Sequence, residues 1–283
     1  MGKILKSGEF DLNKRTMPTI LTKNSIEKLF EEKSKRVLSV YFTAGFPNLH
    51  DTANIMKSLD ASGADIIEVG IPFSDPVADG PTIQESNKIA LDNGISLKLI
   101  FEQLDVIRKE LKIPVILMGY INPVLQFGVE KFCQKCAEVG VAGLILPDLP
   151  LQEYLDEYKS TFEKYGLLNI FLITPQTTAE RIRKIDENSR GFIYMVSSAS
   201  TTGAKGDISA TQIDYFNRVR KMNLKNPTLI GFGISNLETF DLACKHAHGA
   251  IIGSAFINVL KNSRDIHKDI AGFIKSVKGI NRQ

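Results

Sequence analysis

Short apolar runs alternate with amphipathic stretches along most of this chain. The runs are rich in Val, Ile and Leu and are bounded by turn residues, as expected for strands that are buried on both faces. They cover residues 37–42, 64–68, 114–118, 141–146, 168–173, 191–196, 227–231 and 250–252. Between them, apolar residues recur at helical spacing, for example Leu97, Ile100, Leu104, Ile107 and Leu111.

This alternation predicts the fold class. About eight strand-then-helix units over about 250 residues match the count and size of a (β/α)8 TIM barrel, so we expect an α/β protein with one such barrel. A doubly wound open sheet is the alternative, but no Gly-x-Gly-x-x-Gly motif follows the first strand. Residues 1–23 are polar and irregular and are expected to form a flexible arm. Residues 24–283 contain no linker that would divide the barrel domain.

Two carboxylates stand out from this background. Glu68 interrupts an apolar strand, where burying an unpaired charge is costly and therefore needs a reason. Asp79 lies on the stiff loop that follows, which holds three prolines between Ile71 and Thr82. The pair could be a salt-bridged Glu and a turn-forming Asp. It could equally be a catalytic acid and base held in different surroundings.

Glycine-rich turns follow the last two predicted strands. Gly231-Phe232-Gly233-Ile234-Ser235 comes after the seventh strand and Gly253-Ser254 after the eighth. Barrels often bind phosphate here with backbone N–H groups and a helix N-terminus. The Ser254 hydroxyl adds a further donor. Ordinary loop glycines are the alternative for either turn alone, whereas the two together indicate a phosphate site.

Composition narrows the possible functions. A net charge of +3 without a clustered basic stripe argues against nucleic acid as a partner. No apolar run approaches the roughly 20 residues of a membrane-spanning helix. An odd count of three cysteines indicates a reducing compartment, so we expect a cytoplasmic protein. Cys133 and Cys136 form a lone C-x-x-C without further ligands nearby, so no metal is expected.

The loop between the carboxylates carries a specific motif. Residues 68–84 read Glu-Val-Gly-Ile-Pro-Phe-Ser-Asp-Pro-Val-Ala-Asp-Gly-Pro-Thr-Ile-Gln, which resembles the signature of the tryptophan synthase alpha subunit family. The resemblance continues in the family's order over about residues 25–275, through residues 120–123, 147–150, 202–203, 231–235 and 253–254. It implies a (β/α)8 lyase that cleaves indole-3-glycerol phosphate by a retro-aldol reaction to indole and D-glyceraldehyde 3-phosphate.

The same resemblance implies roles for individual residues. Glu68 would protonate the indole ring and then accept a proton from a substrate hydroxyl, and Asp79 would accept the hydrogen bond of the indole N–H. Tyr194 and the loop bearing Thr202 would position this pair. The phosphate would be held by Gly203, Gly233, Gly253 and Ser254. The indole pocket would be formed by Tyr41, Met118, Ile145, Ile173, Phe232 and Ile251.

The family also implies a partner. Its members pass indole to a beta subunit that carries pyridoxal phosphate, in an alpha2beta2 heterotetramer, so no cofactor is expected in this chain. The stiff loop should project from the barrel mouth, and rigid loops lose little entropy on docking. Asp75 and Pro76, next to Asn122 on the neighbouring loop, are therefore the predicted docking face. If these prolines only shape the active site, the chain would be a standalone lyase.

Two features depart from the family pattern. Ser198 and Ser200 stand where many members have Arg and Gly, which puts the ordering and closure of the loop after the sixth strand in doubt. The arm before residue 24 also exceeds the family's usual start. Two other functions remain open: an isomerase of phosphoribosyl substrates, which would not need the two carboxylates at this spacing, and a non-catalytic barrel that only activates a partner. The latter would be expected to have lost a carboxylate, and both are present.

Overall fold

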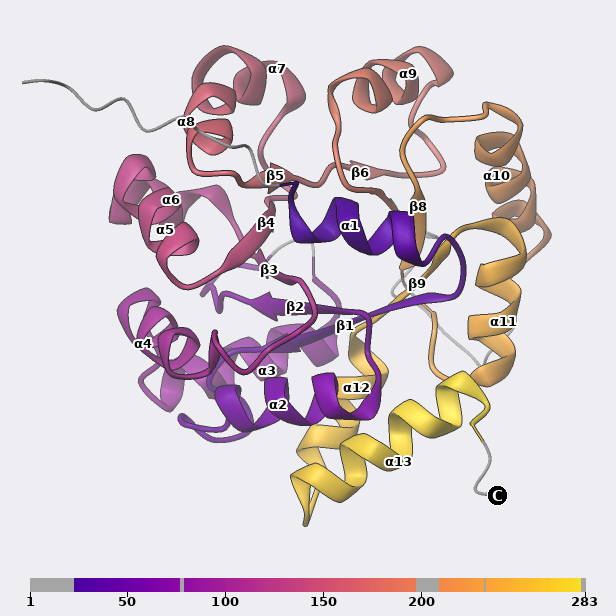
Figure 1. Ribbon diagram of the computed structural model, residues 1–283. Coiled ribbons are helices and arrows are strands. Elements are labelled where there is room, and N and C mark those ends of the chain that lie inside the picture. Colours follow the sequence, from indigo (N-terminus) through magenta and orange to yellow (C-terminus); the bar gives the residue numbers. More distant parts are fainter. Residues whose placement is uncertain (1–22, 77–78, 197–208, 232, 281–283) are drawn as a thin grey trace, which may run out of the picture.

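A parallel sheet ringed by helices makes up the structure, a computed structural model that describes residues 23–76, 79–196, 209–231 and 233–280 (Figure 1). Its strands are β1 (Val37–Thr43), β2 (Ile66–Gly70), β3 (Val115–Met118), β4 (Val141–Ile145), β5 (Leu168–Asn169), β6 (Leu172–Ile173), β7 (Ile193–Val196), β8 (Thr228–Gly231) and β9 (Gly249–Ile252). Every pairing between them is parallel, as the apolar runs predict.

The sheet closes on itself through β5 and β6. These two strands stand at opposite ends of the hydrogen-bonded order β5-β4-β3-β2-β1-β9-β8-β7-β6, yet they follow one another in the chain. Between them, the Ile170 N–H donates to the Leu144 carbonyl of β4, and the Phe171 carbonyl accepts from the Tyr194 N–H of β7, both at 2.9 Å. They are therefore two halves of one strand that joins β4 to β7. The sheet is the predicted eight-stranded barrel, not an open one.

Helices cover the outside of the barrel. They are α1 (Ser25–Glu32), α2 (Thr52–Ser62), α3 (Pro81–Asp92), α4 (Leu97–Ile107), α5 (Ile121–Phe127), α6 (Val129–Glu138), α7 (Leu151–Glu153), the π-helical turn η1 (Tyr154–Tyr158), α8 (Lys159–Lys164), α9 (Ala179–Asn188), α10 (Ala210–Lys221), α11 (Leu237–His246), α12 (Ser254–Lys261) and α13 (Ile266–Lys278). The chain turns at residues 262–265, which separates α12 from α13. The expected loop after β3 passes directly into α5.

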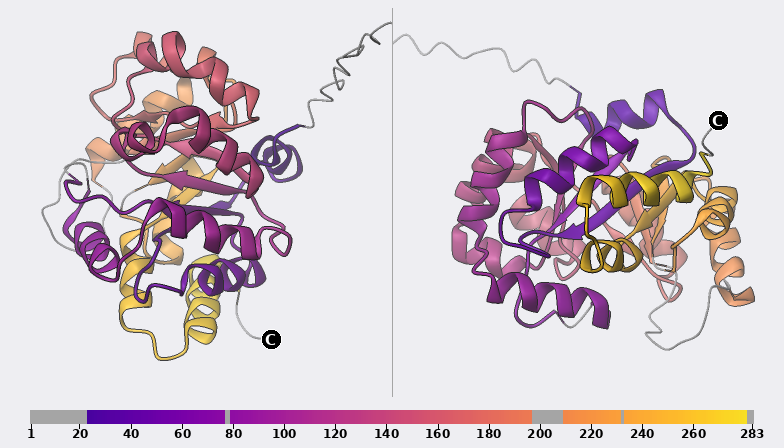
Figure 2. Two further views of the ribbon diagram at one scale, coloured as in Figure 1. Left: turned by 90° about the vertical axis from the view of Figure 1, so that its left-hand side faces the viewer. Right: turned by 90° about the horizontal axis from the view of Figure 1, so that it is seen from below.

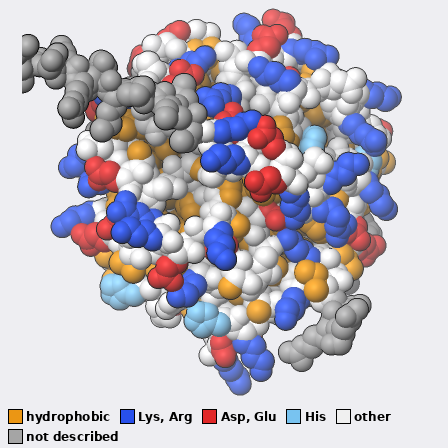
Figure 3. All heavy atoms as spheres, in the orientation of Figure 1, with side chains coloured by type: hydrophobic (Ala, Val, Ile, Leu, Met, Phe, Trp, Pro, Cys, Tyr) orange, Lys and Arg blue, Asp and Glu red, His pale blue; other side chains and the backbone are white. Residues whose placement is uncertain are grey.

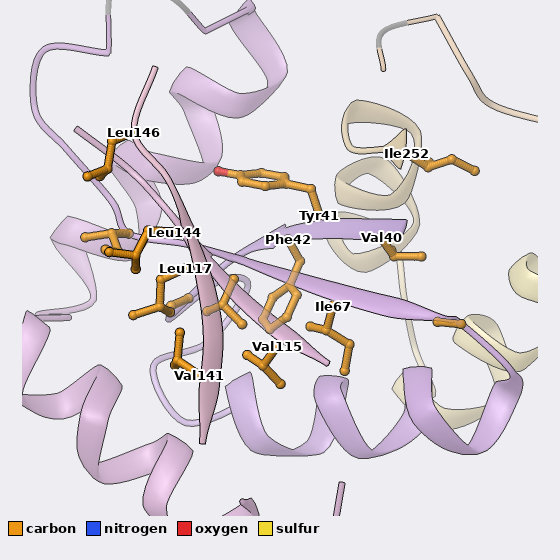
Figure 4. Packing of buried hydrophobic residues seen from close by; sticks show 14 of the residues in the cluster. Val40, Tyr41, Phe42, Ile67, Val115, Leu117, Val141, Leu144, Leu146 and Ile252 are labelled. Carbon is orange, nitrogen blue, oxygen red and sulfur yellow. The ribbon is translucent and has the colours of Figure 1, made fainter. Parts of the chain in front are cut away.

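Strand alternation separates two hydrophobic layers. On β1, Val40 and Phe42 belong to the outer layer between strands and helices, while Tyr41 leaves the strand in the opposite direction (Figure 4). A second cluster fills the barrel interior, with one or two residues from most strands. Cys133 and Cys136 are free, fully buried and part of the outer layer.

One end of the barrel is closed by α1 (Figure 2). The Asn24 side chain accepts from the Ile26 N–H and donates to the carbonyls of Ala142 and Gly166, at 2.8 and 2.9 Å. This ties the helix start to strand β4 and to the turn before β5. Ile26 is fully buried among the interior residues, and a Cβ on Gly143 or Gly191 would press against it. This plug leaves the opposite end, where the strands finish, as the open one.

Lys, Arg, Asp and Glu side chains mix over the face seen in Figure 3, without a stripe of one sign. Among the residues the structure describes, no helix is long and apolar enough to cross a membrane. The predicted arm lies outside the described part of the chain except for Lys23, so its proposed flexibility stays a prediction.

Candidate active site

Glu68 lies inside the barrel on β2, with none of its surface exposed. The Ser39 hydroxyl of β1 donates to Glu68 Oε1 at 2.6 Å, while Glu68 Oε2 has no hydrogen-bond partner. Across the described residues, no Lys, Arg or His forms an ion pair with this carboxyl. The interpretation of Glu68 as a salt-bridged structural residue is therefore wrong.

Burial governs the ionisation of Glu68. Removal from water raises the pKa of its carboxyl from 4.5 to about 7, against the opposing effect of the Ser39 hydrogen bond. At pH 7 the group therefore exists in both protonation states. A carboxyl with this property can give up a proton and take one back at the same pH.

Asp79 lies on the loop that joins β2 to α3, just before the helix begins at Pro81. Asn87 Nδ2 lies 3.5 Å from Asp79 Oδ2, and the Tyr120 side chain makes a second hydrogen bond to the carboxyl. Gln84 fixes the Asp79 backbone by donating to its carbonyl at 2.9 Å. Burial raises the pKa of the Asp79 carboxyl to about 6, and the two hydrogen bonds act in the opposite direction.

Two tyrosines lie close to both carboxyls, each over a glycine of a neighbouring strand. Tyr41 of β1 lies across Gly70 of β2, and Tyr194 of β7 lies across Gly231 of β8, so a Cβ at either glycine would collide with the ring. Burial raises the pKa of both phenols well above the usual range, and the charges of Glu68 and Asp79 add to that effect. The glycines give these rings room to lie flat inside the barrel.

A cavity of about 300 Å³ opens beside these tyrosines at the strand ends. It is lined by Tyr41, Asp79, Ile83, Met118, Tyr194, Gly233, Ile234, Ser235, Ile251, Gly253, Ser254 and Ala255. Eight of these were predicted from the sequence, as catalytic, phosphate-binding or indole-binding residues. Ile83, Ile234, Ser235 and Ala255 were missed, although the first three lie inside motifs that pointed to the site and Ala255 directly follows another.

Other predicted residues lie elsewhere. Glu68 is not on the cavity wall; it lies next to Tyr41 and Tyr194, which are. Ile145 points into the barrel and packs in the same interior cluster as Tyr194, but it does not line the cavity. Gly203 and Phe232, together with Thr202, Ser198 and Ser200, fall outside the described residues.

The prediction that Ile173 lines the pocket is wrong. Ile173 pairs with Met195 of β7 and is buried in the outer layer against the helices. Its neighbour Leu172 pairs with Tyr194 and packs against the interior cluster instead. Since side chains alternate along a strand, Leu172 is the residue of β6 that points into the barrel interior.

The far side of the cavity is suited to an anion. Helix α12 begins at Ser254 and directs its free N–H groups toward the cavity, where they form the positive end of the helix dipole. The hydroxyl-bearing residues Ser235 and Ser254 line the same side. Gly233 has a φ of +78°, a left-handed conformation that would strain any residue with a Cβ. The same cavity therefore holds Asp79 and a helix N-terminus suited to an anion.

The predicted docking residues meet at the rim of this end. Asp75 is exposed and Pro76 half-buried on the loop after β2, while Asn122 is exposed in the first turn of α5. The rings of Phe73 and Tyr120, 5.0 Å apart, join the two segments. Asn122 was expected on a loop, but α5 holds it on a helix.

Comparison with known proteins agrees with this geometry. The model of the family described as "Tryptophan synthase alpha chain" matches residues 28–282. The tryptophan synthase alpha chain of Flavobacterium johnsoniae is 60% identical over 232 residues, which is 82% of this chain and 92% of that protein. The alpha chain of Parabacteroides distasonis is 53% identical over 255 residues, or 90% of this chain and 99% of that protein.

Solved structures give the same answer. The crystal structure of tryptophan synthase subunit alpha from Legionella pneumophila superposes with a TM-score of 0.82 at 34% identity, covering 91% of this chain and 98% of that one. A chain of tryptophan synthase from Mycobacterium tuberculosis superposes with a TM-score of 0.79 at 29% identity, covering 91% and 100%. Sequence, fold and site therefore agree, and the chain belongs to the tryptophan synthase alpha chain family.

Proposed function

We propose that this chain cleaves indole-3-glycerol phosphate to indole and D-glyceraldehyde 3-phosphate, as a carbon–carbon lyase of tryptophan biosynthesis. One observation carries the proposal: a buried carboxyl with a pKa of about 7, which has no cationic partner among the described residues, lies next to two tyrosines of a cavity whose wall also holds Asp79 and a helix N-terminus. Retro-aldol loss of indole needs a proton donor, a stabiliser of positive charge and an anchor for phosphate.

The first step is protonation of the ring. Glu68, in its protonated form, gives its proton to C3 of the indole, which turns a poor carbon leaving group into a cation. The carboxylate of Asp79 accepts the hydrogen bond of the indole N–H and stabilises that cation. Asp79 lies on the cavity wall, and Asn87 and Tyr120 hold its carboxyl in place.

The second step breaks the carbon–carbon bond. The Glu68 carboxylate takes a proton from the substrate hydroxyl next to that bond, and the oxygen becomes the carbonyl of the aldehyde. The bonding electrons return to the ring, neutralise the cation and leave indole. Glu68 ends the cycle protonated, so no proton is gained or lost. Tyr194, fixed over Gly231, positions Glu68 relative to the ring.

The remaining cavity residues divide the substrate between them. The phosphate is bound by Gly253 and Ser254 at the start of α12 and by Gly233 in the loop after β8. Ser235 adds a hydroxyl. Tyr41, Met118 and Ile251 form flat apolar walls for the indole ring. Ile145 stays a proposed second layer of that pocket, and Phe232 and Gly203 stay proposed members of the site.

A beta subunit of tryptophan synthase is the proposed partner, in a cytoplasmic alpha2beta2 complex. The pyridoxal phosphate of that reaction belongs to the partner, and this chain needs no cofactor of its own. Asp75, Pro76 and Asn122 form the proposed docking face, supported by their position on one rim of the barrel mouth. Tyr120 connects this rim to the Asp79 carboxyl.

Replacing either carboxyl tests the function directly. Glu68→Gln and Asp79→Asn should each lower kcat by about 10²- to 10⁴-fold, because each removes an acid–base or charge-stabilising group while keeping its shape. Steady-state release of indole from indole-3-glycerol phosphate measures the effect, and thermal melting of the same samples checks the fold. Turnover near the wild-type value in either variant contradicts the role given to that residue.

The two pKa values predict a bell-shaped pH profile. Asp79 must be ionised, which holds above about pH 6, and Glu68 must be protonated, which holds below about pH 7. We therefore expect kcat/KM to peak between these values and to fall on both sides. The residual activity of Asp79→Asn should lack the acid limb and that of Glu68→Gln the alkaline limb. Flat profiles from pH 5 to 8.5 would contradict the assignment.

A matched pair of variants tests the phosphate site. Ser254→Glu places a negative charge at the start of α12, where it should repel the phosphate and weaken binding of glycerol 3-phosphate by at least about tenfold. Ser254→Gln has nearly the same shape without the charge and should bind much better than the Glu variant. Calorimetry measures both affinities. If the two variants bind equally well, the phosphate lies elsewhere.

The docking face is tested with the partner present. Asn122→Arg puts a large charged side chain on the exposed first turn of α5 and should abolish co-elution with a cognate beta subunit and the stimulation of indole release. The same change at exposed Gln134 on α6, away from the barrel mouth, should leave both intact. An Asn122→Arg variant that is still stimulated like the wild type would move the interface to another surface.

A further inference from the structure

Ser39 is a buried polar residue that no sequence motif indicated. It lies on β1 between Leu38 and Val40, is fully buried and faces the barrel interior opposite Ile66 of β2. Its hydroxyl makes a single hydrogen bond in the described structure, the 2.6 Å donation to Glu68 Oε1. Tyr41, two residues further along the same face, pairs in register with Glu68. The hydroxyl therefore approaches the carboxyl from the deeper side of the barrel.

We propose that Ser39 is the positioning residue for Glu68: its hydroxyl holds Oε1 and leaves Oε2 as the oxygen that exchanges the proton with the substrate. This inference rests on the lyase function proposed above. Because Oε1 already accepts a hydrogen bond, a proton on the carboxyl is placed on Oε2. Oε2 has no hydrogen-bond partner, so nothing in the described structure competes with the substrate for that proton.

The same hydrogen bond also determines how easily Glu68 ionises. The titratable groups that interact with Glu68 are Tyr41 of β1 and Tyr194 of β7, and Asp79 of the β2–α3 loop lies near the same two tyrosines; none of these groups is a cation. A donor bonded to Oε1 favours the carboxylate over the acid, so it counteracts part of the effect of burial. Without the hydroxyl, Glu68 would hold its proton to a higher pH and return to the carboxylate less readily.

Replacing Ser39 should therefore move one limb of the pH profile. In Ser39→Ala we expect the alkaline limb of the kcat/KM profile to shift to higher pH by about one unit, which is the effect of one hydrogen bond to a charged group. We also expect kcat to fall. The acid limb, which belongs to Asp79, should stay in place. Ser39→Thr and Ser39→Val form a matched pair of equal shape, of which only the Thr variant keeps a hydroxyl. Thr should restore the wild-type limb, and Val should behave like Ala.

A measurement without substrate separates this inference from the proposed reaction. The pKa of Glu68 is raised on folding, so its contribution to stability is complete below about pH 4.5 and is lost as pH rises through the folded pKa of about 7. In Ser39→Ala that loss should continue to about pH 8. The difference in unfolding free energy between wild type and Ser39→Ala should thus be constant below pH 7 and grow above it. In a Glu68→Gln background the difference should not depend on pH.

Each outcome decides a separate point. A shifted alkaline limb with a pH-dependent stability difference supports the proposal. An unmoved limb, or a stability difference that is flat with pH in the presence of Glu68, overturns it and leaves Ser39 as a packing residue. If the wild type releases no indole at any pH, the lyase function fails, while the stability cycle still shows whether Ser39 controls the ionisation of Glu68.

Discussion

Closure of the sheet at its fifth strand is the constraint on which the site depends. The two halves of that strand, β5 and β6, bond to β4 on one side and to β7 on the other, and this completes a ring of parallel strands. In such a ring every strand ends on the same rim, and alternate side chains of every strand point to one axis. Glu68 of β2 and Tyr194 of β7, far apart in the chain, meet for this reason alone.

Burial destabilises the charged form of Glu68, and this destabilisation gives the carboxyl its acid–base chemistry. A pKa near 7 in place of 4.5 means that the folded protein disfavours the Glu68 carboxylate by about 3 kcal/mol relative to water. A neighbouring Lys or Arg would remove this penalty and fix the charge, leaving no proton to transfer near neutral pH. The barrel instead supplies one hydroxyl, from Ser39, and apolar surroundings. Asp79, nearer to water, ionises at lower pH and takes the complementary role.

Much of this could be predicted from the sequence, and the errors have physical causes. A charge in an apolar run and a proline-rich loop are visible signals, so Glu68 and Asp79 were found. Ile173 was misplaced because Leu172 and Ile173 are both apolar, and only pairing with β7 shows which one faces inward. Ser39 was missed because a small hydroxyl residue hardly disturbs an apolar pattern. The sequence does not predict that Tyr41 lies across Gly70 and Tyr194 across Gly231, because these contacts form between neighbouring strands and no single apolar run encodes them.

The proposed docking rim is connected through Tyr120 to the Asp79 carboxyl. Tyr120 stacks against Phe73 on the loop that carries Asp75, and its side chain also bonds the Asp79 carboxyl. The Ile121 N–H donates to Asp148 at 3.0 Å, which ties the same helix start to the loop after β4. A partner that binds this rim therefore contacts the segment whose Tyr120 side chain holds Asp79. Glu68 and Ser39, in contrast, are held by strands of the closed barrel. A partner bound at the rim would order the loop carboxyl and leave the strand carboxyl unchanged, so stimulation should raise turnover with little change in the pKa of Glu68.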